Sequence, residues 1–598
     1  MAFALATGRY IGRLSASQVV ETHGFGQVQR SSSHPNWLLI ADQNSPIEQS
    51  PDPRNPWRVA CDGYLSNFAE MAASLPDAQH LQTTRSISQL VAAWLDHAGP
   101  DALFKLVGNF ALVAANENDG SVVAMRDRMG GRTLYRLEDN SNGLLIASRS
   151  AWVQMISHRP FRADEKFLAS FFALQPAPPP GRSAFASVRE FLPGEQLRSQ
   201  SDRIRTQRPD LDLAPDFDYS HPGDCIVRFR ELFEQAVNST LPATGNVACM
   251  LSGGLDSAPA AILADRVLAD RNARVIATSW TLKQFPEACE AKWIAMAAQD
   301  LQAEPLWFDA SHMLPFRHLD DRTLNPDTPH HNAFREPVLE CYRLAAEAGC
   351  RVILNGNAGD EIYAPPHLLN IDRSKRRQWR PIWRDLKALF RHQGLSGLVN
   401  YPAFRHPLAR LIRPFSRTGA SAPVWLTPDN RKHWQAYHPW PPEIEQTAFP
   451  NYTDQLLGAR MAYGRAHENA FPNRYGVDRR DPFHDDPLAR FMLHAPFSLS
   501  HRQGHTKWVM RQATKGLLPK SLRAKSRTGL LNPFWDAGQT TNQETIKRLL
   551  FEHQMAWQAW VEPKALAGIL HETRANTPAP VLSQCIGYAL WNQYWTNR

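Results

Sequence analysis

The chain has 598 residues, of which 43% are hydrophobic and 21% charged, and its formal net charge is +8 at pH 7. This length predicts two or more domains, and the composition excludes a disordered chain. The modest positive charge suits an anionic ligand or an acidic peptide. No compact Lys/Arg run with interleaved aromatics is present, so we expect no nucleic-acid partner.

The cysteines and the first residues indicate the compartment. Seven cysteines are widely spread without a C-x-x-C pair, so we expect neither a disulfide framework nor a zinc site. The start of the chain lacks the basic region of a secretory signal. No apolar run reaches the roughly 18 residues of a membrane span. We therefore expect a cytoplasmic protein.

Residues 1–205 have the pattern of a β-rich domain. Short, nearly continuous apolar runs are typical of strands covered on both faces. Turn-forming residues separate the runs that come later in this part of the chain. These runs are 37–40, 110–113, 122–125 and 144–147. A helical pattern covers 88–97, and the polar, Pro- and Asp-rich stretch 206–223 is a predicted linker.

From residue 224 to 598 the pattern changes to strands alternating with helices. Predicted helices cover 225–238, 287–301 and 335–348, with another from 257; predicted strands cover 247–251, 274–279 and 351–355. Alternation at this spacing predicts an α/β fold with a doubly wound parallel sheet. From about 366 onward the sequence predicts helical and irregular structure.

The stretch "ACMLSGGLDSAPAA", residues 248–261, joins a predicted strand to a predicted helix. Ser252, Gly253 and Gly254 would present bare backbone amides at the N-terminus of that helix, where phosphate binds. Ser252 and Ser257 add hydroxyl donors. A carboxylate beside phosphates requires a bridging cation, so Asp256 indicates Mg²⁺. The alternative is an ordinary glycine-rich turn with a capping Asp.

A second stretch, "VILNGNAGDEIY" at 352–363, places Asp360 after another predicted strand. Ligands bind at the carboxyl ends of strands in such sheets, so Asp360 is expected to face Asp256 and to hold Mg²⁺ with it. Asp360 as a helix N-terminal residue is the alternative. The remaining residues expected to bind the nucleotide are Leu251, Thr278, Asn355 and Gly356.

These stretches resemble the phosphate loop of the ATP pyrophosphatases and, within that family, the asparagine synthetases. "YGVDRRDPFHDDPL" (475–488) and "HTKWVMRQATKGLLPKSLRAKSRTG" (505–529) resemble two further motifs of these enzymes. The resemblance implies ATP as cosubstrate and Lys525 as the catalytic lysine. The family's glutamate after the first Gly of the second motif is Asn357 here. An amide cannot take a proton from an amine, so the general base must lie elsewhere.

The first half of the chain carries its own resemblance. "DGYLSN" (62–67), residues 106–135, "IASRS" (146–150) and "FLPGEQL" (191–197) are similar to the class II glutamine amidotransferase domain, which implies an Ntn-hydrolase-like αββα fold. That domain uses a cysteine directly after the initiator Met. Here the residue is Ala2, so we expect no glutamine hydrolysis and a structural or docking role.

A synthetase without an ammonia supply is expected to use an amine of its own substrate. β-Lactam synthetases place a Tyr at the position of Asn357, which disfavours that branch. An insertion at about 370–450 is rich in Arg and Trp, which suits a surface for a peptide or partner protein and equally suits a helical cap with core Trp and solvated Arg side chains. The chain most resembles a lasso peptide cyclase, which works with a leader peptidase and a leader-binding protein.

By that resemblance the enzyme adenylates an Asp or Glu side chain of a precursor peptide and closes a macrolactam with its N-terminal amine. AMP and pyrophosphate are released. The alternatives are an ammonia-dependent asparagine synthetase and a β-lactam synthetase-like amide ligase. A tRNA-modifying enzyme and a non-catalytic scaffold are less well supported by these motifs.

Overall fold

A computed structural model describes most of the chain. The described residues are 2–13, 29–31, 37–41, 47–51, 56–139, 141–174, 179–200, 203–209, 217–299, 301, 305–319, 324–357, 359–363, 422–437, 468–502, 505–525, 529–552, 555–571 and 580–597, with isolated residues between 377 and 391. Most of the Arg/Trp-rich insertion and residues 210–216 of the predicted linker lie outside them. Every described helix is too short or too polar to cross a membrane.

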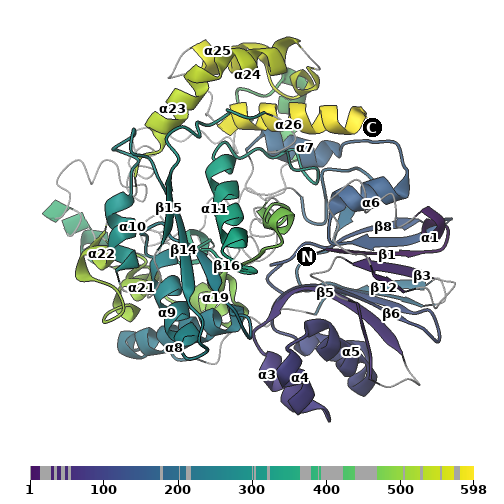
Figure 1. Cartoon of the computed structure of the whole chain (residues 1–598). Coiled ribbons are helices and arrows are strands. Elements are labelled where there is room, and N and C mark those ends of the chain that lie inside the picture. The colour runs from purple at the N-terminus through teal and green to yellow at the C-terminus, as the bar shows by residue number, and fades with distance from the viewer. Residues whose placement is uncertain are drawn as a thin grey trace.

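Two antiparallel six-stranded sheets form the first part of the chain, at the right of Figure 1. The first has the order β10(Arg189–Glu190), β8(Tyr135–Asp139), β9(Gly143–Ala147), β1(Phe3–Thr7), β3(Trp37–Ala41), β2(Gln29–Ser31). The second has the order β12(Arg203–Gln207), β11(Gln196–Gln200), β7(Val122–Arg126), β6(Gly108–Asn116), β5(Trp57–Leu65), β4(Glu48–Gln49).

These sheets pack face to face with helices outside them. One hydrophobic cluster joins β1 and β3 to β5, β6 and β7, and it includes Phe3, Trp37 and Val113. Helices α6(Ser150–Ser157) and α7(Glu165–Phe172) cover the first sheet, and α5(Ile87–Ala98) covers the second. All nine residues of β6 are buried, because the strand is covered on both faces. The predicted αββα domain is confirmed.

The second part of the chain is built on a five-stranded parallel sheet. Its order is β15(Leu306–Asp309), β14(Val275–Thr281), β13(Val247–Met250), β16(Val352–Leu354), β17(Asp478–Arg480). Helices α8(Pro222–Thr240), α9(Ser257–Ala269) and α10(Ala291–Ala298) pack on one face, and α11(Arg335–Glu347) packs on the other. The predicted doubly wound sheet is confirmed. The strand order reverses between β13 and β16, and ligands of such sheets bind at this point.

Two local predictions were wrong. The helix predicted over 287–301 is shorter, since α10 begins at Ala291 after an N-cap at Glu290. The region after 366, predicted to hold only helices and loops, contributes the strand β17. Its residues Asp478-Arg479-Arg480 are charged, so no apolar run marks it. β12 also extends to Gln207 and α8 begins at Pro222, so regular structure enters both ends of the predicted linker.

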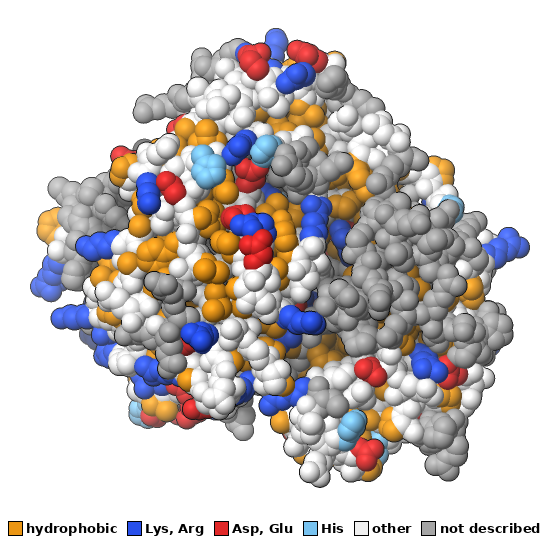
Figure 2. Space-filling model, viewed as in Figure 1, with side chains coloured by type: hydrophobic (Ala, Val, Ile, Leu, Met, Phe, Trp, Pro, Cys, Tyr) orange, Lys and Arg blue, Asp and Glu red, His pale blue; other side chains and the backbone are white. Residues whose placement is uncertain are grey.

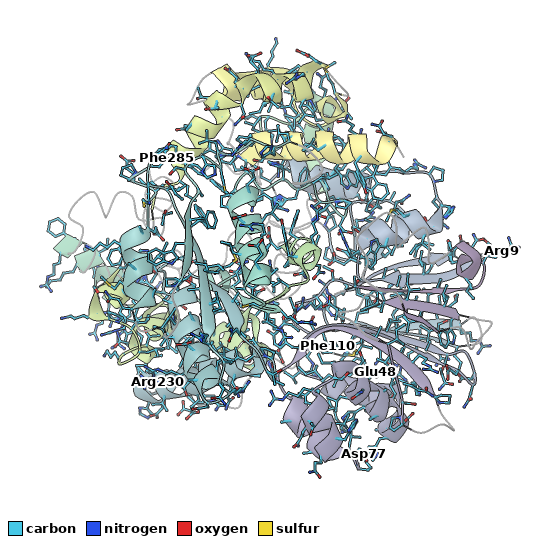
Figure 3. The ribbon with its side chains drawn as sticks, in the orientation of Figure 1. Arg9, Glu48, Asp77, Phe110, Arg230 and Phe285 are labelled. Carbon is cyan, nitrogen blue, oxygen red and sulfur yellow. The ribbon has the colours of Figure 1, made fainter. Side chains whose placement is uncertain are left out.

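The C-terminal helices complete the molecule. α19(Asp486–His494), α21(Trp508–Ala513) and α22(Lys520–Ala524) pack near the parallel sheet. α23(Asn532–Thr541) and α26(Pro580–Thr596) lie above it, and α26 contacts α7 (Figure 1). Phe285, shortly after β14, and Arg230 of α8 lie at opposite ends of this part of the protein in Figure 3. Phe285 packs edge-on against Phe534 of α23, at the end where the strands terminate.

A buried charged seam joins the two parts. Arg132 of the first part places a guanidinium nitrogen 2.6 Å from an oxygen of Asp478 in β17, and a second nitrogen 3.5 Å from Asp62. Arg480 pairs with the same Asp478 at 2.7 Å. Burial favours a raised pKa for Asp478, but the two arginines outweigh it and lower that pKa to about 2. Asp478 is therefore a carboxylate held by both parts of the chain.

Candidate active site

The loop after β13 is shaped by its own hydroxyl groups and by one glycine. The Ser252 amide donates to the Ser257 hydroxyl at 3.0 Å, and the two hydroxyl oxygens lie 3.0 Å apart. Gly253 has φ +63°, and a Cβ there would lie 2.5 Å from the backbone carbon of Trp293. Only glycine fits this conformation and space. The loop then enters α9, with Asp256 as the N-cap residue.

Neighbouring strands bring the other predicted residues to this loop. The Leu251 amide donates to the Thr278 carbonyl at 2.9 Å, so β14 runs beside the start of the loop. Asn355 follows β16, and its amide donates to the Arg480 carbonyl of β17 at 3.1 Å. A Cβ on Gly356 would lie 3.0 Å from the Ser257 nitrogen. The loops after β13 and β16 are thus in close contact at the switch point.

Asp256 and Asp360 converge on one cation, the ammonium group of Lys507. Its Nζ is 2.5 Å from Asp256 Oδ2 and 2.7 Å from Asp360 Oδ1. Burial favours a lower pKa for Lys507, but the two carboxylates outweigh it and raise that pKa above the usual value. Lys507 itself has φ +53° and precedes α21. The structure therefore holds three charges together in a partly buried position.

Lys525 lies on the other side of the loop. Its Nζ is 2.9 Å from Glu290 Oε1 and 3.3 Å from the Gly253 carbonyl, and it stands 5.2 Å from the centre of the Trp293 ring. Arg511 donates to the backbone carbonyl of Lys525 at 3.0 Å, which fixes the segment that carries the lysine. A positive charge is thus placed at the backbone of the loop predicted to bind phosphate, where charge developing on a substrate would be stabilised.

A cavity of about 550 Å³ connects these groups. This volume lies within the range of ligand-binding sites. The predicted residues that line it are Leu251, Ser252, Asp256, Ser257, Thr278, Asn355, Gly356 and Asp360. Gly253, Gly254 and Lys525 do not line it directly, although Glu290, the partner of Lys525, does. Its apolar wall includes Trp280, Leu282, Ile294, Val338 and Leu531.

Two residues at the site were missed by sequence reasoning. Lys507 lies in the stretch 505–529, which resembles a motif of the asparagine synthetases, but that resemblance assigned a role to Lys525 alone. Glu290 falls inside a stretch predicted as helix and had no motif to mark it. The pairing of each with a predicted residue spans more than two hundred positions along the chain. Only the fold shows these contacts.

The residues present fit a divalent cation. Two carboxylates from different loops already share one cation, and oxygen ligands from carboxylates are those that Mg²⁺ prefers. A Cβ on Gly359 would lie 2.5 Å from Asp256 Oδ1, so glycine there keeps this carboxylate in place. Asp256 and Asp360 would hold the ion, and a bound Mg²⁺ would neutralise charge on a phosphate chain.

The fold and the cavity define the class of protein as a doubly wound α/β protein with a ligand-sized cavity at the switch point of its parallel sheet. Residues 228–593 match the asparagine synthase family, and residues 38–209 match a glutamine amidotransferase domain. The chain belongs to the asparagine synthase family, and it is an ATP-dependent carbon–nitrogen ligase.

Named relatives are distant. The chain is 21% identical to asparagine synthetase (glutamine-hydrolyzing) 1 of Bacillus subtilis (strain 168) over 83% of this chain and 79% of that protein. It is 25% identical to asparagine synthetase (glutamine-hydrolyzing) 3 of the same organism, over 34% of this chain and 32% of that protein. It is 27% identical to amidase chry2 of Gibberella zeae, over 36% of this chain and 33% of that protein. The family is shared, and the substrate is left open.

Proposed function

We propose that this enzyme activates a substrate carboxylate as its AMP ester and transfers the acyl group to an amine of the same substrate. The carboxylate oxygen would attack the α-phosphate of ATP, and pyrophosphate would leave. The observation that carries this proposal is the convergence of Asp256 and Asp360 on one cation beside the loop of Ser252 and Ser257. Lys525 at the loop backbone would stabilise the charge that develops during acyl transfer.

An amine supplied by the substrate is supported by the first half of the chain. Ala2 stands directly before β1, where it is buried and offers no nucleophile for glutamine. Arg132, Asp62 and Asp478 form a buried ion-pair network between the two halves. Such a network fits the docking role that we propose for the first half.

We further propose that the substrate is a precursor peptide and the product a macrolactam, as in lasso peptide cyclases. The amine would be the N-terminal α-amine, and a leader peptidase and a leader-binding protein would supply the peptide. Within the Arg/Trp-rich insertion, the described side chains of Trp379 and Trp383 are 53% and 68% exposed. Basic residues Arg380 and Arg384 are exposed beside them. Lys and Arg side chains also gather at the edge of the face that carries α10 and α22 (Figure 2).

The test is exchange of labelled pyrophosphate into ATP. The probe is a pool of synthetic peptides, each with a free N-terminal amine and one internal Asp or Glu. We expect exchange with this pool, followed by AMP and a peptide lighter by one water. The same peptides with an acetylated N-terminus should support exchange but give no cyclic product. Formation of ADP and phosphate would contradict the proposal.

An ammonia-dependent asparagine synthetase is the second candidate, because the Bacillus subtilis relative matches most of both chains. The discriminating arm uses L-aspartate with ammonium and measures asparagine. A β-lactam synthetase-like ligase would instead close a ring within a small amino acid, without a peptide. Exchange that requires L-aspartate and ignores the peptide pool would favour the asparagine synthetase.

A further inference from the structure

Glu468 differs from the other carboxylates of the cavity. Among the described lining residues, Asp256, Asp360 and Glu290 each have a lysine ammonium within 3 Å, as the distances of 2.5, 2.7 and 2.9 Å show. Among the described residues, the cation paired with Glu468 is Arg335, whose guanidinium lies 3.7 Å from Oε1 and so beyond hydrogen-bond distance. Glu468 therefore lines the cavity without a close lysine or arginine partner among the described residues, so its oxygens can accept from a ligand there.

Tyr342 lines the cavity beside this carboxylate. Its side chain on α11 is fully buried, and its hydroxyl makes no hydrogen bond to any residue that the structure describes. Burial and the charge of Glu468 raise the pKa of Tyr342 well above its usual value, with Asp481 acting in the same direction and Arg479 against it. The phenol thus stays protonated and remains a donor for a substrate group or for Glu468.

Arg335 supplies a fixed positive charge behind Glu468. Its side chain is 1% exposed, and its guanidinium lies 3.5 Å from the centre of the Phe471 ring. None of its three guanidinium nitrogens hydrogen-bonds to a described residue. An arginine stays protonated in proteins, so Arg335 places a fixed positive charge 3.7 Å from Glu468.

We infer that Glu468 is the proton acceptor for the attacking amine, with Tyr342 and Arg335 as its positioning residues. This inference rests on the proposed function. The amine lone pair attacks the acyl carbon of the AMP ester, and the carbonyl electrons move to oxygen. The N–H proton passes to Glu468, the carbonyl re-forms, and the bond to the AMP phosphate oxygen breaks. Glu468 then returns the proton to water.

A carboxylate is a strong enough base for this step because of the acid–base chemistry of the attacking amine. An N-terminal α-amine has an ordinary pKa of about 7.7–8.0, so a useful fraction is neutral near that pH. Once its nitrogen bonds to the acyl carbon, its N–H becomes strongly acidic, and a carboxylate can remove it. Asn357 lines the same cavity but cannot accept a proton. Glu468 therefore supplies the function that Asn357 lacks.

The experiment separates the two half-reactions of the Glu468→Gln enzyme, using the peptide pool described above. We expect pyrophosphate exchange within about threefold of the unaltered enzyme and cyclic product reduced at least about 100-fold, the usual contribution of a general base. Hydroxylamine, a weakly basic nucleophile, should trap the acyl group as a hydroxamate in both enzymes. Retained exchange also shows that the variant is folded.

Glu347→Gln is the matched control, since Glu347 is on the same helix as Tyr342 but is 59% exposed and pairs with Arg343. It should change neither half-reaction, while Tyr342→Phe should weaken product formation and spare exchange. Normal cyclic product from Glu468→Gln, or equal loss of exchange and product, would overturn the inference. Absence of exchange with the unaltered enzyme would refute the proposed function, and this inference with it.

Discussion

Lys507 gives the most direct test of the metal site. Its ammonium occupies the space between Asp256 and Asp360, and its side chain is 9% exposed. A divalent cation bound by both carboxylates must displace this ammonium. Lys507→Met keeps the length of the side chain and removes the charge. We therefore expect the nucleotide-free variant to bind Mn²⁺, used as a probe for Mg²⁺, more tightly than the unaltered enzyme.

The magnitude follows from the short distance to Asp256. At 2.5 Å, and with an effective dielectric constant of about 20, the attraction is about 7 kcal/mol before any cost is counted. Asp360 is 85% exposed and adds little through water. Desolvation of the buried pair offsets most of the attraction and leaves roughly 2 kcal/mol. Since 1.4 kcal/mol is a factor of ten, the variant should bind Mn²⁺ about 30-fold more tightly.

Calorimetric titration with Mn²⁺, or the electron paramagnetic resonance signal of free Mn²⁺, measures this affinity. Lys515→Met is the matched control, because Lys515 follows α21, is exposed and lies away from the cavity. Adding Asp256→Asn to Lys507→Met should abolish the gain. Unchanged Mn²⁺ affinity in Lys507→Met would refute the assignment of the two aspartates as metal ligands.

Three further changes test the surroundings of the site. Gly359→Ala should displace Asp256, whose Oδ1 would lie 2.5 Å from the new Cβ, and should reduce pyrophosphate exchange at least tenfold with little change in Tm. Arg132→Met removes one of the two arginines that pair with the buried Asp478 carboxylate. Thermal unfolding should therefore show a decrease of about 3 kcal/mol in the free energy of unfolding. Burial, partly offset by its hydrogen bond from a serine, raises the pKa of Asp485 to about 6. The folded protein therefore loses stability as pH rises from about 4 to 6. An asparagine side chain cannot ionise, so melting curves should show the free energy of unfolding of Asp485→Asn rising relative to that of the unaltered enzyme, by up to about 3 kcal/mol across that window.

The loop around Asp256 was predictable because its requirements are local. A phosphate needs bare amides at a helix start, and glycines and hydroxyls at adjacent positions supply them. Asp360 was predictable for a related reason, since parallel strands end at one edge of the sheet. The sheet order then places β13 and β16 side by side and brings the two acids together.

The contacts of Lys507 and Glu468 could not be predicted in this way. Lys507 meets Asp256 across 251 positions, through a helix start with φ +53°, and no local pattern encodes that geometry. Glu468 and Tyr342 come from separate segments whose shared cavity exists only after α11 packs on the sheet. β17 was missed because buried ion pairs, rather than apolar side chains, hold it in place.

The same strand explains why a synthetase would keep a first half without a nucleophile. Arg132 of that half pairs with Asp478, at the start of β17. β17 pairs with β16, and its Arg480 carbonyl accepts the amide of Asn355, which lines the cavity. One hydrogen-bonded strand pair, β16 with β17, therefore lies between the seam and the loop predicted to bind the nucleotide. The first half packs against the edge strand of the candidate active site, and a chain that lost it would expose a charged edge strand next to the residues predicted to bind ATP.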